Sequence, residues 1–187
     1  GMYYNYYNYI SHLSKEEAKE FTILLEELEK REKRESSMAS FYDFVKAIWP
    51  EFIAGAHHKK MAEAFDKIAS GESKRLIINM PPRHTKSEFA SYLFPAYLLG
   101  KRPKLKIIEA THTADLAINF GRRVRDLIES EEYAEIFPAT ELKADSRSAG
   151  KWNTSQGGQY YAAGIGGALA GRGADLFIID DPHSEQD

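Results

Sequence analysis

The sequence predicts an α/β domain with a mainly parallel central sheet flanked by helices, preceded by a small helical segment. Short apolar runs, each with the length of a buried strand, alternate with longer segments that have helical periodicity. Parallel strands need crossover connections, and these helical segments supply them. With 187 residues, of which 43% are apolar, the chain is long enough to bury one sizeable core.

The N-terminal part is expected to be helical after a Tyr-rich arm over residues 2–10. Ser14 and Glu17 form a capping-box pattern, and apolar residues then recur every three or four positions. The expected helices of this part cover residues 14–35, 40–49 and 57–69. We therefore divide the chain into an arm with a charged helix, residues 1–39, and a domain, residues 40–187.

The rest of the chain alternates between strands and helices. The expected strands cover residues 76–78, 105–110, 159–163 and 176–179. Expected helices cover residues 87–99 and 114–130, and Pro95 is expected to kink or stop the first of them. Residues 131–147 are expected to be mostly helix end and loop.

The composition excludes several classes of protein. Without cysteine, the chain has no disulfide scaffold, thiolate metal site or thiol nucleophile. Its longest nearly apolar stretch, residues 89–99, is far shorter than the roughly 20 residues of a transmembrane helix. The net charge of −3 argues against a uniformly basic nucleic-acid binder, but not against a local basic strip.

A candidate phosphate-binding loop follows the first expected strand. Residues 80–87 read MPPRHTKS, in which Lys86 and Ser87 match the end of the P-loop pattern G-x-x-x-x-G-K-[ST]. Met80 and Thr85 replace its two glycines. The alternative interpretation is a Pro-rich turn with an N-capping serine and a solvent-exposed lysine. The residues expected to bind nucleotide are Pro82, Arg83, His84, Thr85, Lys86 and Ser87.

Each of these residues has a chemical reason to be in such a loop. Backbone amides at the start of the helix can face phosphate oxygens, and Lys86 can reach the β- and γ-phosphates. The Ser87 hydroxyl can coordinate Mg²⁺, and Arg83 adds positive charge beside the γ-phosphate position. The cofactors that this interpretation requires are ATP and Mg²⁺.

Two carboxylates end the last expected strand, where an enzyme of this kind needs them. Asp180 and Asp181 follow the apolar residues 176–179, and the intervening strand and helices allow Asp180 to lie on a strand beside the loop strand. In this interpretation Ser87 and Asp180 are the metal ligands. Asp181 stands where many such ATPases use a catalytic glutamate, and Glu185 is the other candidate for this catalytic carboxylate.

A basic strip covers residues 101–125, with seven Lys and Arg residues against two acidic ones. Arg122, Arg123 and Arg125 lie close together on an expected helix. We expect them to contact phosphates of double-stranded DNA without reading its sequence. The alternative is a solvated helix face with ion-pair partners one turn away.

Several strings in one order resemble those of a known family. They are RLIINMPPRHTKSE, LG-x-x-P at residues 99–103, LA-x-x-x-x-RRVRDLI from Leu116, FP at residues 137–138, W-x-T-x-x-GG at residues 152–158, and GRGADLFIIDDP. From about residue 57 onward, the chain resembles the ATPase domain of the large terminase subunit of tailed bacteriophages, the motor that packages viral DNA. The family commonly has glycine where Thr85 stands.

The resemblance implies an ASCE-type P-loop NTPase, in which Asp180 is the Walker B acid and Asp181 occupies the catalytic position. Arg83 is implied to stabilise charge on the γ-phosphate. It also implies that ATP hydrolysis moves double-stranded DNA into a procapsid, with the protein in a homo-oligomeric ring. The implied partners are the portal protein and the small terminase subunit, in the cytoplasm of an infected bacterium and not at a membrane.

Family members also carry a metal-dependent nuclease domain that cuts concatemeric DNA. We expect the ATPase domain of this chain to be cut short at its C-terminal side, with the nuclease domain absent. Two other functions stay open at this point. One is another DNA-dependent ATPase, such as a helicase-like translocase. The other is a non-hydrolysing nucleotide- or DNA-binding module, because both P-loop glycines are replaced.

Overall fold

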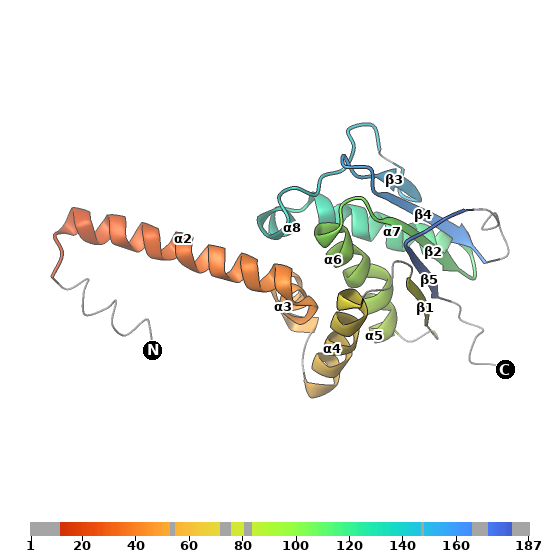
Figure 1. Cartoon of the computed structure of the whole chain (residues 1–187), viewed down its shortest axis with the longest axis horizontal. Helices are drawn as coiled ribbons and strands as arrows, with labels where there is room; N and C mark the ends of the chain where they lie inside the picture. The colour runs from red at the N-terminus through yellow and green to blue at the C-terminus, as the bar shows by residue number, and fades with distance from the viewer. Residues whose placement is uncertain are drawn as a thin grey trace. The chain divides into compact units, whose positions relative to one another are not determined.

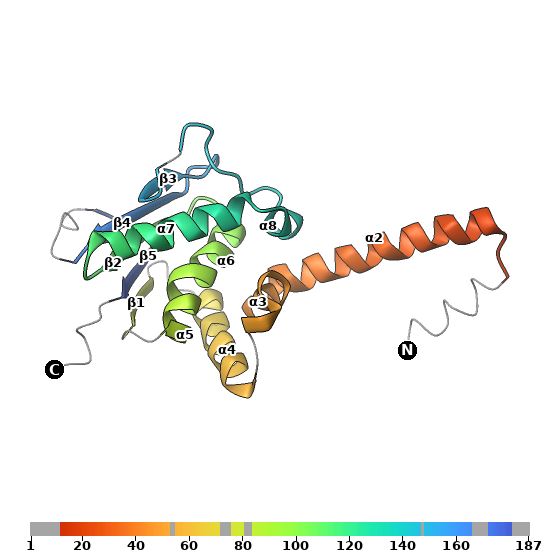
Figure 2. The same cartoon turned by 180° about the vertical axis from the view of Figure 1, so that it is seen from behind.

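The chain forms two compact units, one that ends at Ser36 and one that begins at Ser37. The expected Tyr-rich arm lies outside the described residues. Among the residues that are described, no helix is both long enough and apolar enough to span a lipid bilayer. The computed structural model describes residues 12–52, 55–71, 76–80, 84–146, 148–165 and 172–180 (Figures 1 and 2).

Helix α2 (Lys15–Ala39) forms most of the described part of the first unit. Its start confirms the expected cap, because the Glu17 amide donates to Ser14 Oγ over 3.2 Å. The helix runs past the expected end at residue 35, since residues 36–39 include neither glycine nor proline.

Near the beginning of the second unit, the start of helix α3 is capped by two side chains. The Ser40 hydroxyl caps α3 by accepting from the Asp43 amide. Asp66 of α4 accepts from the Phe41 amide over 2.6 Å and from the Tyr42 amide over 3.4 Å, so its charge also lies at the positive end of α3. The elements of this part are α3 (Phe41–Ile48), the 3₁₀ turn η1 (Pro50–Phe52) and α4 (Ala56–Ser70).

A five-stranded sheet with the order β1-β5-β2-β4-β3 forms the centre of this unit. The pairs β1–β5, β5–β2 and β2–β4 are parallel, and only β3 on the edge is antiparallel. The predicted mainly parallel sheet is therefore confirmed. The strands are β1 (Leu76–Met80), β2 (Lys106–Thr111), β3 (Lys151–Asn153), β4 (Gln159–Gly164) and β5 (Leu176–Asp180).

The helices between the strands cover one face of this sheet. The connections β1 to β2 and β2 to β4 step across the sheet in the same direction, so right-handed crossovers place their helices on the same face. In agreement, α7 contacts both β2 and β4 and also lies against η2 and α6 (Figure 2). These helices are α5 (His84–Ser87), the π-helix η2 (Glu88–Leu93), α6 (Phe94–Lys101), α7 (Ala114–Glu129) and α8 (Glu131–Ile136).

The sequence had led us to expect a kink or a stop at Pro95, but the helix does not stop there. Residues 84–101 are continuously helical, and Pro95 falls at the start of α6, where a missing backbone N–H is tolerated. The preceding turns form the π-helix, which closes with the Phe94 amide bonded to the Phe89 carbonyl. Sequence periodicity gave no sign of this widened turn.

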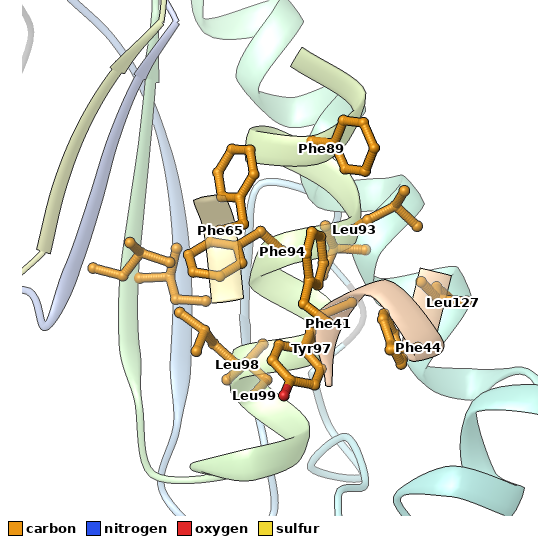
Figure 3. Packing of buried hydrophobic residues seen from close by; sticks show 14 of the residues in the cluster. Phe41, Phe44, Phe65, Phe89, Leu93, Phe94, Tyr97, Leu98, Leu99 and Leu127 are labelled. Carbon is orange, nitrogen blue, oxygen red and sulfur yellow. The ribbon is translucent and has the colours of Figure 1, made fainter. Parts of the chain in front are cut away.

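Aromatic side chains fill the core between α3, α4, η2 and α6 (Figure 3). Phe41 is fully buried, and its ring centroid lies 5.4 Å from those of both Phe94 and Tyr97. Phe65 from α4 and Phe89 from η2 also pack against Phe41. Burying rings of this size stabilises the unit by about 2–3 kcal/mol each, and ties the helices that precede the sheet to those that cover it.

Residues of the family-like strings meet at the amino ends of the strands. Thr154 Oγ1 donates to the Pro103 carbonyl over 2.6 Å and accepts from the Gly158 amide over 2.7 Å. A Cβ on Gly158 would lie 2.3 Å from that same carbonyl oxygen, so only glycine fits there. Trp152 donates to the Gly121 carbonyl and stacks on Tyr160. In this part of the chain, the W-x-T-x-x-GG string is explained by packing.

Candidate active site

The ends of three strands lie side by side at the carboxyl edge of the sheet. Met80, Asp180 and Thr111 are the last residues of β1, β5 and β2, and they pair in register. This confirms the expectation that Asp180 lies on a strand next to the loop strand. In open parallel α/β sheets, ligands bind in the crevice outside the carboxyl ends of the strands.

Lys86 and Ser87 lie in the first turn of the helical run that follows β1. Both side chains are half-buried, and neither forms a hydrogen bond or ion pair with another described residue. Ser87 has helical backbone angles, φ −63° and ψ −39°, and its side chain makes no capping hydrogen bond. It is therefore not the N-capping serine of the alternative interpretation.

Ser91 connects this helical run to Asp180. Its hydroxyl lies on the π-helix η2 and donates to Asp180 Oδ2 over 3.3 Å, in a site where both residues are almost completely buried. The contact joins the helix that follows the candidate loop to the strand that carries the candidate metal ligand, 89 positions apart in sequence.

A second carboxyl group, Glu109 on β2, lies in the same buried region. Neither of its oxygens accepts a hydrogen bond from a described residue. Burial raises the pKa of Glu109 well above its usual range; the nearby Ser91 hydroxyl opposes this rise, and the charge of Asp180 adds to it. Sequence reasoning missed Glu109, although a carboxylate in the middle of an apolar strand was the available signal.

Several predicted residues lie outside the described part of the chain: Pro82, Arg83, Asp181 and Glu185. His84 and Thr85 form the start of α5. In the described residues, no three His, Cys, Asp or Glu side chains gather as ligands of a metal ion.

The three arginines predicted to contact DNA have different surroundings. Arg122 is exposed and donates to Asn119 Oδ1 over 2.8 Å. Arg123 binds Glu88 of η2, and Arg125 lies 3.3 Å from Asp126 Oδ1. Arg123 is thus bound to another helix, whereas the neighbours of Arg122 and Arg125 named here belong to α7 itself. Arg122 is the one most accessible to a DNA phosphate.

The rest of the basic strip precedes β2 or begins it, at the amino edge of the sheet. Lys101 lies over the Tyr97 ring and Arg102 donates to the Ala69 carbonyl, both before β2 begins. Thr111 ends β2 at the carboxyl edge, where its hydroxyl accepts from the Ala117 amide and so holds the start of α7.

Arg172, which belongs to the GRGAD part of the family-like strings, lies away from this edge. Its guanidinium stacks 3.7 Å from the centroid of the Tyr161 ring. Tyr161 neighbours Tyr160 on β4, and Tyr160 faces α7; the alternation along a strand thus places Tyr161 on the opposite face of the sheet.

Comparison of the chain with protein-family models, curated proteins and solved structures finds no match. The α/β class and the site geometry therefore rest on the sheet order and the contacts described above.

Proposed function

We propose that this chain is an ASCE-type P-loop ATPase, the motor part of a large terminase that uses Mg²⁺ and ATP to move double-stranded DNA into a procapsid. The observation that carries the proposal is the in-register pairing of Met80 with Asp180. It brings the loop that contains Lys86 and Ser87 to the strand that ends in a buried carboxylate. The family strings quoted above support the choice of terminase among such ATPases.

In this proposal each residue has a separate task. Lys86 neutralises charge on the β- and γ-phosphates, and the Ser87 hydroxyl and Asp180 carboxylate supply oxygen ligands for Mg²⁺. Arg83 stabilises charge that develops on the γ-phosphate. Asp181 accepts the proton of the attacking water, with Glu185 as the other candidate for this role.

The DNA contact in this proposal is electrostatic and independent of base sequence. Arg122 is the principal contact, because it is exposed on α7, and Arg125, whose side chain is only 18% exposed, is a weaker contact. The proposed partners in assembly are further copies of this chain in a ring, the portal protein and the small terminase subunit. Cutting of concatemers is proposed for a nuclease domain of the complete protein.

The first test is ATP hydrolysis with and without double-stranded DNA, in the wild-type protein and in Lys86→Ala. We expect Lys86→Ala to lower turnover by at least about 100-fold, because the loop lysine contacts the transferred phosphoryl group. Lys143→Ala is the matched control, since Lys143 is exposed and far from the candidate loop in sequence. Equal turnover in Lys86→Ala and the wild type would refute the assignment of this loop.

The second test separates the motor from its alternatives. For a motor that grips DNA phosphates, Arg122→Glu with Arg125→Glu should weaken DNA affinity and reduce its salt dependence, whereas Arg31→Glu in α2 should not. Stimulation of packaging by the portal would support the terminase, and strand separation would support a helicase-like translocase. Nucleotide binding without turnover, even with DNA and the portal present, would support a non-hydrolysing module.

A further inference from the structure

Arg123 and Glu88 form a bidentate ion pair directly behind the candidate phosphate-binding turn. Glu88 follows Ser87 and is the first residue of the π-helix η2. Arg123 Nη1 donates to Glu88 Oε1 over 2.8 Å, and Nη2 donates to Glu88 Oε2. The side chains are only 39% and 22% exposed, so the pair is less screened than one on an open surface. A two-point contact also fixes the orientation of both groups.

An aromatic ring holds the same guanidinium from another side. Tyr92, one turn after Glu88 on η2, has its ring centroid 4.2 Å from the centre of the Arg123 guanidinium. The planar group is thus both bonded at its edge and stacked on its face, a combination that lysine cannot reproduce. These contacts fix the position of the Arg123 guanidinium, which in turn fixes the position of the Glu88 carboxylate.

The ion pair completes a closed path of contacts around the carboxyl edge of the sheet. From Glu88, the π-helix reaches Ser91, whose hydroxyl binds Asp180. Asp180 pairs in register with Thr111, and the Thr111 hydroxyl holds the first turn of α7 through the Ala117 amide. Helix α7 then returns to Glu88 through Arg123. π-Helical turns of this kind often occur at functional sites.

We propose that Arg123 is a positioning residue for the phosphate-binding turn. By holding Glu88 against α7, it sets the orientation of the adjacent turn that carries Lys86 and Ser87. This inference rests on the proposed function, because it assigns to Arg123 a role in nucleotide binding at that same site. It also changes the prediction made for Arg123 from the sequence: its guanidinium serves the nucleotide side of α7, and Arg122 serves the DNA side.

The experiment compares Arg123→Gln and Arg123→Lys with Arg31→Gln, a control that removes an arginine from an exposed ion pair. Binding of Mg·ATPγS, thermal unfolding and amide hydrogen exchange of residues 84–88 are measured for each protein. We expect Arg123→Gln to bind about 10-fold more weakly than the wild type. Arg123→Lys should be intermediate, because it keeps the charge but not the two-point contact. Arg31→Gln should bind as the wild type does.

Exchange of the amides of residues 84–88 should be faster in Arg123→Gln than in the control. Wild-type affinity and wild-type exchange in Arg123→Gln would overturn the inference, as would full rescue of affinity by Arg123→Lys. If Arg123→Gln does not fold, Arg123→Lys decides by the same criteria. If the wild-type protein itself does not bind Mg·ATPγS, the proposed function fails; exchange at residues 84–88 then decides the positioning role alone, and unchanged exchange overturns it.

Discussion

The two edges of the central sheet differ in how completely their polar groups are hydrogen-bonded. At the amino edge, Asp175 accepts from the Lys106 amide over 2.9 Å, and Thr154 links the Gly158 amide to the Pro103 carbonyl. Near the carboxyl edge, Asp180 and Thr111 are also hydrogen-bonded. Glu109, two residues before the end of β2, is instead buried with no hydrogen-bond partner among the described residues.

This difference separates a scaffold from a candidate site. Buried polar groups are normally hydrogen-bonded, because an unpaired one costs about 1–3 kcal/mol. The free-energy cost of burying an unpaired carboxyl group therefore falls near the carboxyl edge. Ligands of parallel sheets bind outside this edge. Glycine and threonine at the amino edge thus hold the scaffold together, and the unpaired carboxyl group lies near the candidate site.

At the amino edge, we expect the largest loss of stability from a substitution at Gly158. In Gly158→Ala the new Cβ would meet the Pro103 carbonyl oxygen at 2.3 Å and Thr154 Oγ1 at 2.7 Å, and a backbone atom cannot move aside cheaply. We expect a loss of about 3 kcal/mol in the free energy of unfolding, measured by urea denaturation. Gly173→Ala is the control, since nothing lies within 4 Å of a Cβ there. Equal stabilities of the two variants would show that the amino edge is not tightly built.

Near the carboxyl edge, a substitution at Glu109 should stabilise the protein instead of destabilising it. The pKa of Glu109 is raised in the folded state above its ordinary value of 4.5, so the folded protein binds this proton more tightly than the unfolded chain does. The stability that the proton provides is complete below pH 4.5 and is lost as the pH rises through the folded-state pKa. Glu109→Gln, which cannot ionise, should therefore stabilise the protein at pH 8 by about 2 kcal/mol and have little effect at pH 4.

Urea denaturation at the two pH values measures this effect. The matched control is Glu141→Gln, because Glu141 is exposed. A stability difference between Glu109→Gln and the wild type that does not change with pH would contradict a buried, ionisable Glu109.

A smaller effect is expected at Asp175, on the amino edge. Asp175→Ala removes the acceptor of the Lys106 amide at the first residue of β2. We expect a loss of about 1 kcal/mol, because water can replace part of this partly exposed hydrogen bond. Asp145→Ala, at an exposed turn, should change the free energy of unfolding by less than about 0.5 kcal/mol. Equal changes in the two variants would show that the Asp175 hydrogen bond does not contribute to stability.

Much of the fold could be predicted from the sequence, because its longest signals are periodic. The strands β1, β2, β4 and β5 and helix α7 lie within a few residues of their expected bounds. Strand β3 was not predicted, since three residues are too few to show alternation. The cap of Asp66 on α3 was also missed, because it joins residues 25 positions apart.

The candidate site was predictable only in part. Local patterns indicated Lys86, Ser87 and Asp180, and the strand order then brought them to one edge. The surroundings of Glu109 and Arg123 depend on strand register and on which side of a helix meets which neighbour. A single sequence does not specify those tertiary contacts, and so three adjacent arginines were grouped although they face different partners.

The central claim is that nucleotide binds at the carboxyl edge of the sheet, beside β1 and β5. Amide hydrogen exchange of the wild-type protein, with and without saturating Mg·ATPγS, tests it most directly. If nucleotide binds there, exchange is slower at residues 84–91 and at the end of β5, unchanged at residues 151–159 on the amino edge, and no longer slowed in Lys86→Ala. Protection confined to the amino edge, or identical protection in Lys86→Ala, would contradict it.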